Sequence, residues 1–163
     1  FYCKVKNIPD KRFKQSFILE NNNLCLQKKM TGNKTFTIIK PDAFGAGKSG
    51  SIIKIIEEAG FSIKNMRLLK MDIEMASKFY SVHKERPFFE RLCNYMCSGP
   101  IIVIELQKDN AVSDFRKLIG STNPEDAEEG TIRKLYATSI EANAIHGSDS
   151  DENAEIEINF FFS

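Results

Sequence analysis

The chain has 163 residues and a formal net charge of +1 at pH 7, with 42% hydrophobic and 28% charged residues. This length and composition suit one ordinary globular domain, and no apolar run approaches the roughly 20 residues of a membrane-spanning helix, so we expect no membrane partner. Because residues 30–163 carry 16 basic and 20 acidic side chains, we do not expect a surface for nucleic-acid binding.

Residues 1–29 differ from the rest of the chain in charge and pattern. They hold seven basic and two acidic side chains and show no steady hydrophobic period. The layout of a secretory signal is missing, and the likeness to a transit peptide is limited to charge. We interpret residues 1–29 as a basic leader, either non-native or disordered, and residues 30–163 as the folded domain that starts at Met30.

Strand and helix patterns alternate along the body. In chain order we predict a strand at 35–39, a loop at 41–47, a helix at 49–59, a strand at 61–71, helices at 73–83 and 87–96, a strand at 101–106, a helix at 111–119, a strand at 131–138 and a helix at 150–162. Helices are predicted where apolar residues recur at helical spacing, and strands where β-branched residues gather or apolar residues alternate. The polar loop at 121–130 is too long for a plain connector, which points to a functional role.

This order of elements predicts the fold class. An α+β, ferredoxin-like βαββαβ sandwich with an antiparallel sheet and added helices typically has this order, namely strand, helix, strand, helices, strand, helix, strand. We expect helices to cover one face of the sheet. The four cysteines (Cys3, Cys25, Cys93 and Cys97) lack the paired spacing of a zinc site, and we interpret them as thiols of a reduced, cytoplasmic protein.

Residues 42–49, DAFGAGKS, resemble a phosphate-binding loop between a strand and a helix. The first position of that motif is Asp42 instead of glycine, and its carboxylate would face the phosphates. A P-loop NTPase that uses Lys48 and Ser49 is therefore the alternative interpretation.

His146 lies in the string NAIHGSDS, residues 143–150. An imidazole that is neutral near pH 7 is a competent nucleophile toward a phosphoryl group. Gly147 is expected to let the backbone turn tightly beside it. Ser148 and the residues after it can cap the next helix, on which Glu157 could reach back to the ring. Taken alone, this pattern also fits a simple helix-capping loop that contains a histidine.

Further motifs occur in a fixed order around this histidine. They are Lys40-Pro41-Asp42, Arg86-Pro87-Phe88-Phe89, Thr122-Asn123-Pro124 and Gly130-Thr131-Ile132-Arg133. Together with the HGSDS string and Asn143, they make residues 34–163 resemble the nucleoside diphosphate kinase family. The resemblance implies transfer of the terminal phosphoryl group of ATP to nucleoside diphosphates, in two half-reactions through a phosphohistidine on His146.

The resemblance also implies the residues of the site. The catalytic set is His146, Lys40, Tyr80, Ser148 and Glu157. The nucleotide-binding set is Lys40, Phe88, Leu92, Arg116, Thr122, Arg133, Ile140 and Asn143. Arginine forks suit phosphate oxygens, and an aromatic ring stacks on any base. Phe89 and His83 are interpreted as a core residue and a surface residue, and Asp42 as a brace for Lys40.

The implied partners are ATP and nucleoside diphosphates, with Mg²⁺ bound through the nucleotide phosphates, since no protein cluster in the sequence suits that ion by itself. The resemblance further implies a homo-oligomer, either a tetramer or a hexamer. A non-catalytic nucleotide-binding relative is the remaining alternative, against which the presence of His146, Lys40 and Arg133 argues.

Overall fold

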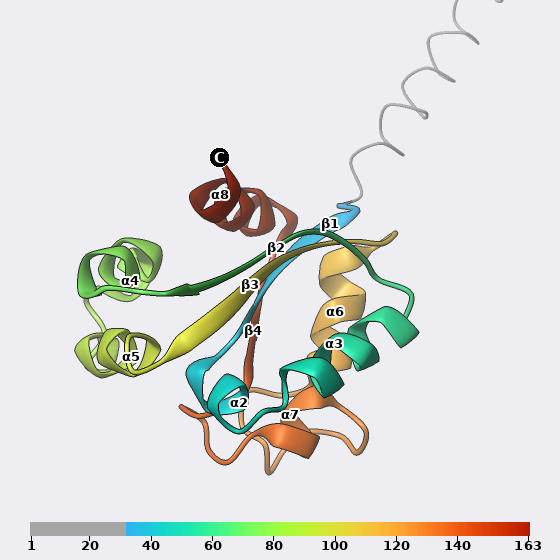
Figure 1. The fold of residues 1–163 in the computed structure, drawn as a ribbon, viewed down its shortest axis with the longest axis horizontal. Helices are drawn as coiled ribbons and strands as arrows, with labels where there is room; N and C mark the ends of the chain where they lie inside the picture. The colour runs from blue at the N-terminus through green and yellow to red at the C-terminus, as the bar shows by residue number, and fades with distance from the viewer. Residues whose placement is uncertain (1–31) are drawn as a thin grey trace, which may run out of the picture. The chain divides into compact units, whose positions relative to one another are not determined.

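The computed structural model describes residues 32–163 (Figure 1). The expected leader at residues 1–29 and its boundary lie outside the described residues. The strands are β1 (Lys34–Ile39), β2 (Ser62–Lys70), β3 (Pro100–Gln107) and β4 (Ile145–Gly147). The helices are α2 (Pro41–Gly45), α3 (Ser49–Glu58), α4 (Ile73–Phe79), the 3₁₀ turn η2 (Ser81–His83), α5 (Phe89–Met96), α6 (Ala111–Ile119), α7 (Ile132–Tyr136) and α8 (Asp151–Phe162).

The four strands form one antiparallel sheet in the order β2-β3-β1-β4. This arrangement agrees with the predicted ferredoxin-like fold. Strand β1 lies at the centre, where Ile38 pairs with Val103 of β3 on one side and with His146 of β4 on the other. Every residue of β1 after Lys34 is buried. The central strand therefore gives β4, a strand of three residues, a rigid neighbour.

Helices cover both faces of the sheet, so the expectation of one covered face is wrong. Alternate residues of β1 and β3 point to opposite sides and join two separate hydrophobic clusters. One cluster includes Phe36 and Ile38 with residues of α4, α5 and α8, and the other includes Ile39 and Ile104 with residues of α3, α6 and α7. Figure 1 shows these two helix groups on opposite sides of the strands.

Two of the predicted elements are wrong. The predicted loop at 41–47 contains helix α2, in which Pro41 occupies the first turn, where its fixed φ and missing N–H are tolerated. The predicted strand at 131–138 is helix α7. Its apolar residues Ile132, Leu135 and Tyr136 are spaced three and four apart, which is a helical pattern that the β-branched start of the segment obscured. The fourth strand is instead Ile145–Gly147.

The other predicted strands and helices lie within a few residues of the observed ones. Helix α6 ends at Gly120, whose φ of 82° is one that glycine adopts without strain. Helix α8 begins after Ser150, whose hydroxyl accepts a hydrogen bond from the backbone N–H of Asn153. Within residues 32–163, no helix combines the length and apolar character needed to cross a membrane.

Candidate active site

A cavity of about 1200 Å³ opens between the α4–α5 pair, the loop at 121–130, the segment 138–143 and helix α8. Strand β4 lies along its wall. The cavity is lined by all the predicted site residues except Ser148, namely Lys40, Tyr80, Phe88, Leu92, Arg116, Thr122, Arg133, Ile140, Asn143, His146 and Glu157. The fold thus brings together residues that are up to 117 positions apart in the chain.

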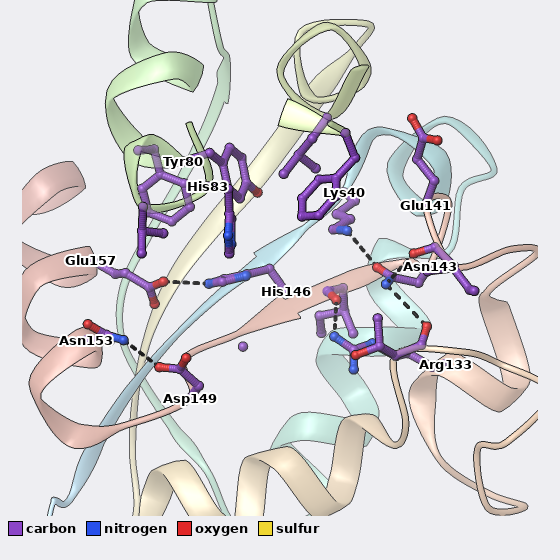
Figure 2. Close-up of a pocket in the computed structure, with 18 of the residues that line it drawn as sticks. Lys40, Tyr80, His83, Arg133, Glu141, Asn143, His146, Asp149, Asn153 and Glu157 are labelled. Carbon is purple, nitrogen blue, oxygen red and sulfur yellow. Dashed lines mark hydrogen bonds and ion pairs between the residues drawn. The ribbon is translucent and has the colours of Figure 1, made fainter. Parts of the chain in front are cut away.

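His146 is held by a carboxylate on helix α8. Its Nε2 atom lies 2.8 Å from Oε1 of Glu157, as Figure 2 shows. The other carboxylate oxygen, Oε2, accepts a hydrogen bond of 2.5 Å from Ser148 Oγ, which in turn accepts one from the backbone N–H of Phe36. Ser148 thus acts on the imidazole through Glu157. This relay orients the ring from two elements, β1 and α8.

The contact with Glu157 also decides which ring nitrogen is free. A carboxylate only accepts hydrogen bonds, so a neutral imidazole beside it carries its proton on Nε2. The lone pair then resides on Nδ1. Because the ring of His146 lines the cavity, the arrangement presents a nucleophilic nitrogen to whatever occupies that space.

Lys40 follows strand β1 and lies buried beside Asn143. Its Nζ donates a hydrogen bond of 2.6 Å to Oδ1 of Asn143. The amide of Asn143 donates in turn to the carbonyl oxygens of Ile140, at 2.8 Å, and Thr122, at 3.4 Å. Burial, and next the nearby Arg133 cation, lower the pKa of Lys40 to about 8. At pH 7 the ammonium form still dominates, so Lys40 can neutralise phosphate charge.

Arg133 on α7 joins three segments around the cavity. Its guanidinium donates to the carbonyl oxygens of Gly120, at 2.9 Å, and Ile145, at 3.0 Å, while its buried Nε has no hydrogen-bond partner. Burial first, and then the charge of Arg116, lower the pKa of Arg133 to about 10. The guanidinium therefore stays charged at neutral pH, and its proximity to Arg116 gives this wall two cations.

Apolar side chains form the outer part of the cavity. Phe88 and Leu92 come from the α5 region, and Ile140 from the segment opposite. Phe88 is 40% exposed and Ile140 is 62% exposed, so both apolar side chains are accessible to a bound group. The ring of His83 lies 5.7 Å from that of Phe88. His83, which we interpreted as a surface residue, is half-buried and lines the same cavity.

Tyr80 is buried at the inner end of α4, and its hydroxyl has no hydrogen-bond partner. Burial, followed by the charge of Glu157, raises the pKa of this hydroxyl. Figure 2 shows the Tyr80 ring above His146. Arg116 and Thr122 also line the cavity, and both are exposed. Phe89 packs against the core cluster of α4 and α8, as expected.

Gly147 serves a different purpose from the expected one. It lies inside strand β4 instead of in a tight turn. A Cβ atom at this position would lie 2.9 Å from Cδ1 of Phe115. Glycine is therefore required because helix α6 packs closely against the strand that carries His146.

Sequence reasoning missed two charged residues at the mouth of the cavity. Arg91 of α5 forms an ion pair of 2.8 Å with Glu141, and both line the cavity. The pair links the helix that carries Leu92 to the segment that carries Ile140. The two partners are 50 positions apart, so no local spacing in the sequence could have revealed it.

The alternative phosphate loop is not favoured by the geometry. Residues 41–45 are helical, and Lys48 is an exposed residue at the start of α3. Neither Lys48 nor Ser49 lines the cavity that contains His146. The backbone N–H groups of a phosphate loop would have to face a shared centre, whereas those of Phe44 and Ala46 bond within α2.

Comparisons with known proteins show which family the chain resembles. A family model described as nucleoside diphosphate kinase matches residues 33–163. A nucleoside diphosphate kinase of Flavobacterium psychrophilum is 58% identical over 134 residues, which cover 82% of this chain and 96% of that protein. One of Chlamydia muridarum is 50% identical over 130 residues, covering 80% of this chain and 92% of its own length.

Solved structures are similar over the same part of the chain. The nucleoside diphosphate kinase of Aquifex aeolicus superposes with a TM-score of 0.79 at 40% identity, covering 80% of this chain and 95% of that one. The enzyme of Encephalitozoon cuniculi gives a TM-score of 0.78 at 39% identity, with 80% and 88% covered. By family model, sequence identity and fold, the chain belongs to the nucleoside diphosphate kinase family.

Proposed function

We propose that the chain is an active nucleoside diphosphate kinase that transfers the terminal phosphoryl group of ATP to nucleoside diphosphates through a phosphohistidine on His146. The observation that carries this proposal is the hydrogen bond between Nε2 of His146 and Glu157. It leaves the lone pair on Nδ1 of a ring that lines the same cavity as Lys40, Arg116 and Arg133.

The first half-reaction is an in-line displacement at the γ-phosphorus. The Nδ1 lone pair forms the N–P bond while the bond from phosphorus to the bridging oxygen breaks, and ADP leaves with that electron pair. In the second half-reaction a terminal phosphate oxygen of another nucleoside diphosphate attacks the same phosphorus, and the N–P electrons return to Nδ1. Glu157 stabilises the imidazole that is positively charged during the transfer.

The cations of the cavity have a positioning and charge-stabilising role. Lys40 and the two arginines would contact phosphate oxygens, on which negative charge is redistributed in the transition state. Thr122 adds a hydroxyl donor, and Asn143 fixes the Lys40 ammonium. Phe88 would stack on the base, with Leu92 and Ile140 beside it, and stacking of this kind tolerates every base.

Mg²⁺ belongs to the substrate in this proposal. Within residues 32–163, no group of three or more His, Cys, Asp or Glu side chains could hold a metal ion. An ion that binds through the nucleotide phosphates fits this donor set, and its charge would offset that of the phosphates. We further propose that residues 30–163 form the catalytic domain and that the chain assembles as a tetramer or hexamer.

The test is phosphoenzyme formation with ATP labelled at the γ-phosphate. The wild type should acquire label that is acid-labile and base-stable, as phosphohistidine is, and should lose it on addition of a nucleoside diphosphate. His146→Ala should acquire no label and show no steady-state transfer, while still binding ADP. Substantial transfer by His146→Ala would contradict the proposal.

A further inference from the structure

Asp42 is a half-buried residue that the proposed mechanism does not use, and the Oδ1 atom of its carboxylate is buried. It lies in the first turn of α2, two residues after Lys40, and is not among the residues that line the cavity. Its Oδ2 atom accepts a hydrogen bond of 2.9 Å from the backbone N–H of Ala144, which is 102 positions away. Asp42 therefore binds the backbone between Asn143 and His146 without lining the cavity itself.

Ala144 has an unusual backbone conformation. It is fully buried, and its φ is 66°, a left-handed value that residues other than glycine rarely adopt. The N–H of Ile145 donates a 2.7 Å hydrogen bond to the carbonyl of Asn143. A positive φ inside such a three-residue hydrogen-bonded turn marks the strained form of the γ-turn. Strained backbone of this kind persists only where its surroundings hold it.

The segment around Lys40 forms hydrogen bonds with both the carbonyl and the N–H group of Ala144. The N–H of Lys40 donates a 2.9 Å hydrogen bond to the carbonyl of Ala144, while the Asp42 carboxylate accepts from the N–H of the same residue. The turn separates Asn143, which binds the Lys40 ammonium, from His146 two residues after Ala144. Releasing the turn would therefore change the relative placement of both side chains.

The second oxygen of Asp42 adds a charge effect. Oδ1 is buried without a hydrogen-bond partner, as is the hydroxyl of Tyr95. Burial, and next the neighbouring Asp42, raise the pKa of Tyr95, and the Tyr95 ring lies 5.9 Å from Nζ of Lys40. The carboxylate of Asp42 and the ring of Tyr95 therefore both lie near the ammonium of Lys40.

We infer that Asp42 is a positioning residue for phosphoryl transfer, which holds the strained turn at Ala144 and places a carboxylate near the Lys40 ammonium. This inference rests on the proposed function. The groups that face Lys40 are Asp42 from α2, Arg133 from α7, Glu141 from the segment before β4 and the Tyr95 ring from α5. Of the charged ones, Asp42 and Glu141 favour the ammonium, and Arg133 opposes it.

Two substitutions separate the two effects. Asp42→Asn keeps an oxygen that can accept from Ala144 but removes the charge, whereas Asp42→Ala removes both. The matched control is Asp72→Ala, because Asp72 also accepts a backbone N–H, that of Met75 at 2.8 Å, but caps α4 outside the cavity. All variants are made in the full chain and compared with the wild type by thermal melting and by steady-state transfer from pH 6 to 10.

We expect Asp42→Asn to move the alkaline limb of kcat/KM to lower pH, because the Lys40 ammonium loses a stabilising charge. Asp42→Ala should in addition lower kcat roughly a hundredfold, the loss typical of a small misplacement of reacting groups. Asp72→Ala should lower the melting temperature while kcat and the pH limb stay at wild-type values. The inference would be overturned if Asp42→Asn showed the pH profile and the kcat of the wild type. It would also be overturned if both Asp42 variants, like Asp72→Ala, lost only melting temperature and kept the wild-type kcat and pH limb. Absence of transfer by the wild type in the same assay would instead overturn the proposed function.

Discussion

At the scale of single residues, opposing effects on Lys40 set the pH range in which the site can bind phosphate. Burial first, and then the charge of Arg133, outweigh the opposing effects, and the net pKa falls from 10.5 to about 8, which corresponds to roughly 3 kcal/mol against the charged form. The carboxylates of Asp42 and Glu141 act in the opposite direction. With a net pKa of about 8 the ammonium is the main form at pH 7, where a neutral amine would not stabilise transition-state charge.

The pH dependence of kcat/KM should follow from this balance. In the free enzyme Lys40 is charged below pH 8 and loses its proton as the pH rises through that value, so kcat/KM should fall on the alkaline side with an apparent pKa of about 8. Lys40→Arg carries a cation that does not titrate in this range. Its kcat/KM, although lower, should stay flat through pH 9, and an alkaline limb that persists near pH 8 in this variant would assign the titration to another group.

Lys40, just after β1, and Lys48, just before α3, provide a second test at this scale. Lys40→Ala removes a buried cation and leaves the Oδ1 atom of Asn143 without its donor, so turnover should fall about a hundredfold to a thousandfold. Lys48→Ala changes an exposed residue outside the cavity and should leave turnover unchanged. Steady-state transfer with ATP and a nucleoside diphosphate measures both. A larger loss in Lys48→Ala would favour the phosphate-loop interpretation.

At the scale of elements, helix α8 positions the carboxylate that holds His146. Phe161, one turn after Glu157, stacks on Phe36 of β1 with ring centroids 5.2 Å apart and planes 7° apart. The backbone N–H of Phe36 also donates a hydrogen bond to Ser148 Oγ, which completes the relay to Glu157. The packing of α8 on the central strand therefore sets the distance between Glu157 and the imidazole.

Two neighbouring phenylalanines of α8 test this role. Phe161 is 4% exposed, whereas Phe160 is 39% exposed. Phe161→Ala should lower the free energy of unfolding by about 3–5 kcal/mol, through lost burial and the cavity that remains. It should also lower turnover, because Glu157 shifts. Phe160→Ala should cost about 1 kcal/mol or less. Urea denaturation and transfer assays check both, and equal effects of the two substitutions would show that the stacked pair does not anchor the helix.

The sequence predicts the long periodic elements better than the short ones. Helix α3 has isoleucines at helical spacing and Gly60 after its end, and both signals are local. By contrast, strand β4 is three residues long and carries too short an apolar pattern to be recognised. It is a strand because Ile38 of the central strand lies opposite His146. Pairing over such a sequence distance is invisible to any local pattern.

The same limit applies to the site. The resemblance to a family pointed to His146, Lys40 and Arg133, because the motifs that contain them are strings of adjacent residues. Other contacts join residues that are far apart in the chain. The hydrogen bond from Ala144 to Asp42 spans 102 positions, and the ion pair of Arg91 with Glu141 spans 50. The positive φ of Ala144 was also hidden, because alanine gives no sign of a left-handed conformation in the way that glycine does.

At the scale of the whole molecule, strand β2 is the least protected part of the described fold. It pairs only with β3, so its other edge has no neighbour within residues 32–163. Met66 and Leu68 point to the same side of the strand and are 53% and 60% exposed. Natural proteins rarely leave an apolar edge strand open, because its backbone groups and side chains can pair with another chain.

We therefore expect β2 to be covered by a second copy of the chain. Light scattering coupled to size-exclusion chromatography should give a mass of four or six times the 18.5 kDa of one chain. Charges at Met66→Lys and Leu68→Lys would be buried without partners at such an interface, so the double variant should elute as a smaller species. Ile73→Lys is the matched control, because Ile73 is 53% exposed at the start of α4 and should leave the mass unchanged. A monomeric wild type, or an unchanged mass in the double variant, would show that β2 is not the contact.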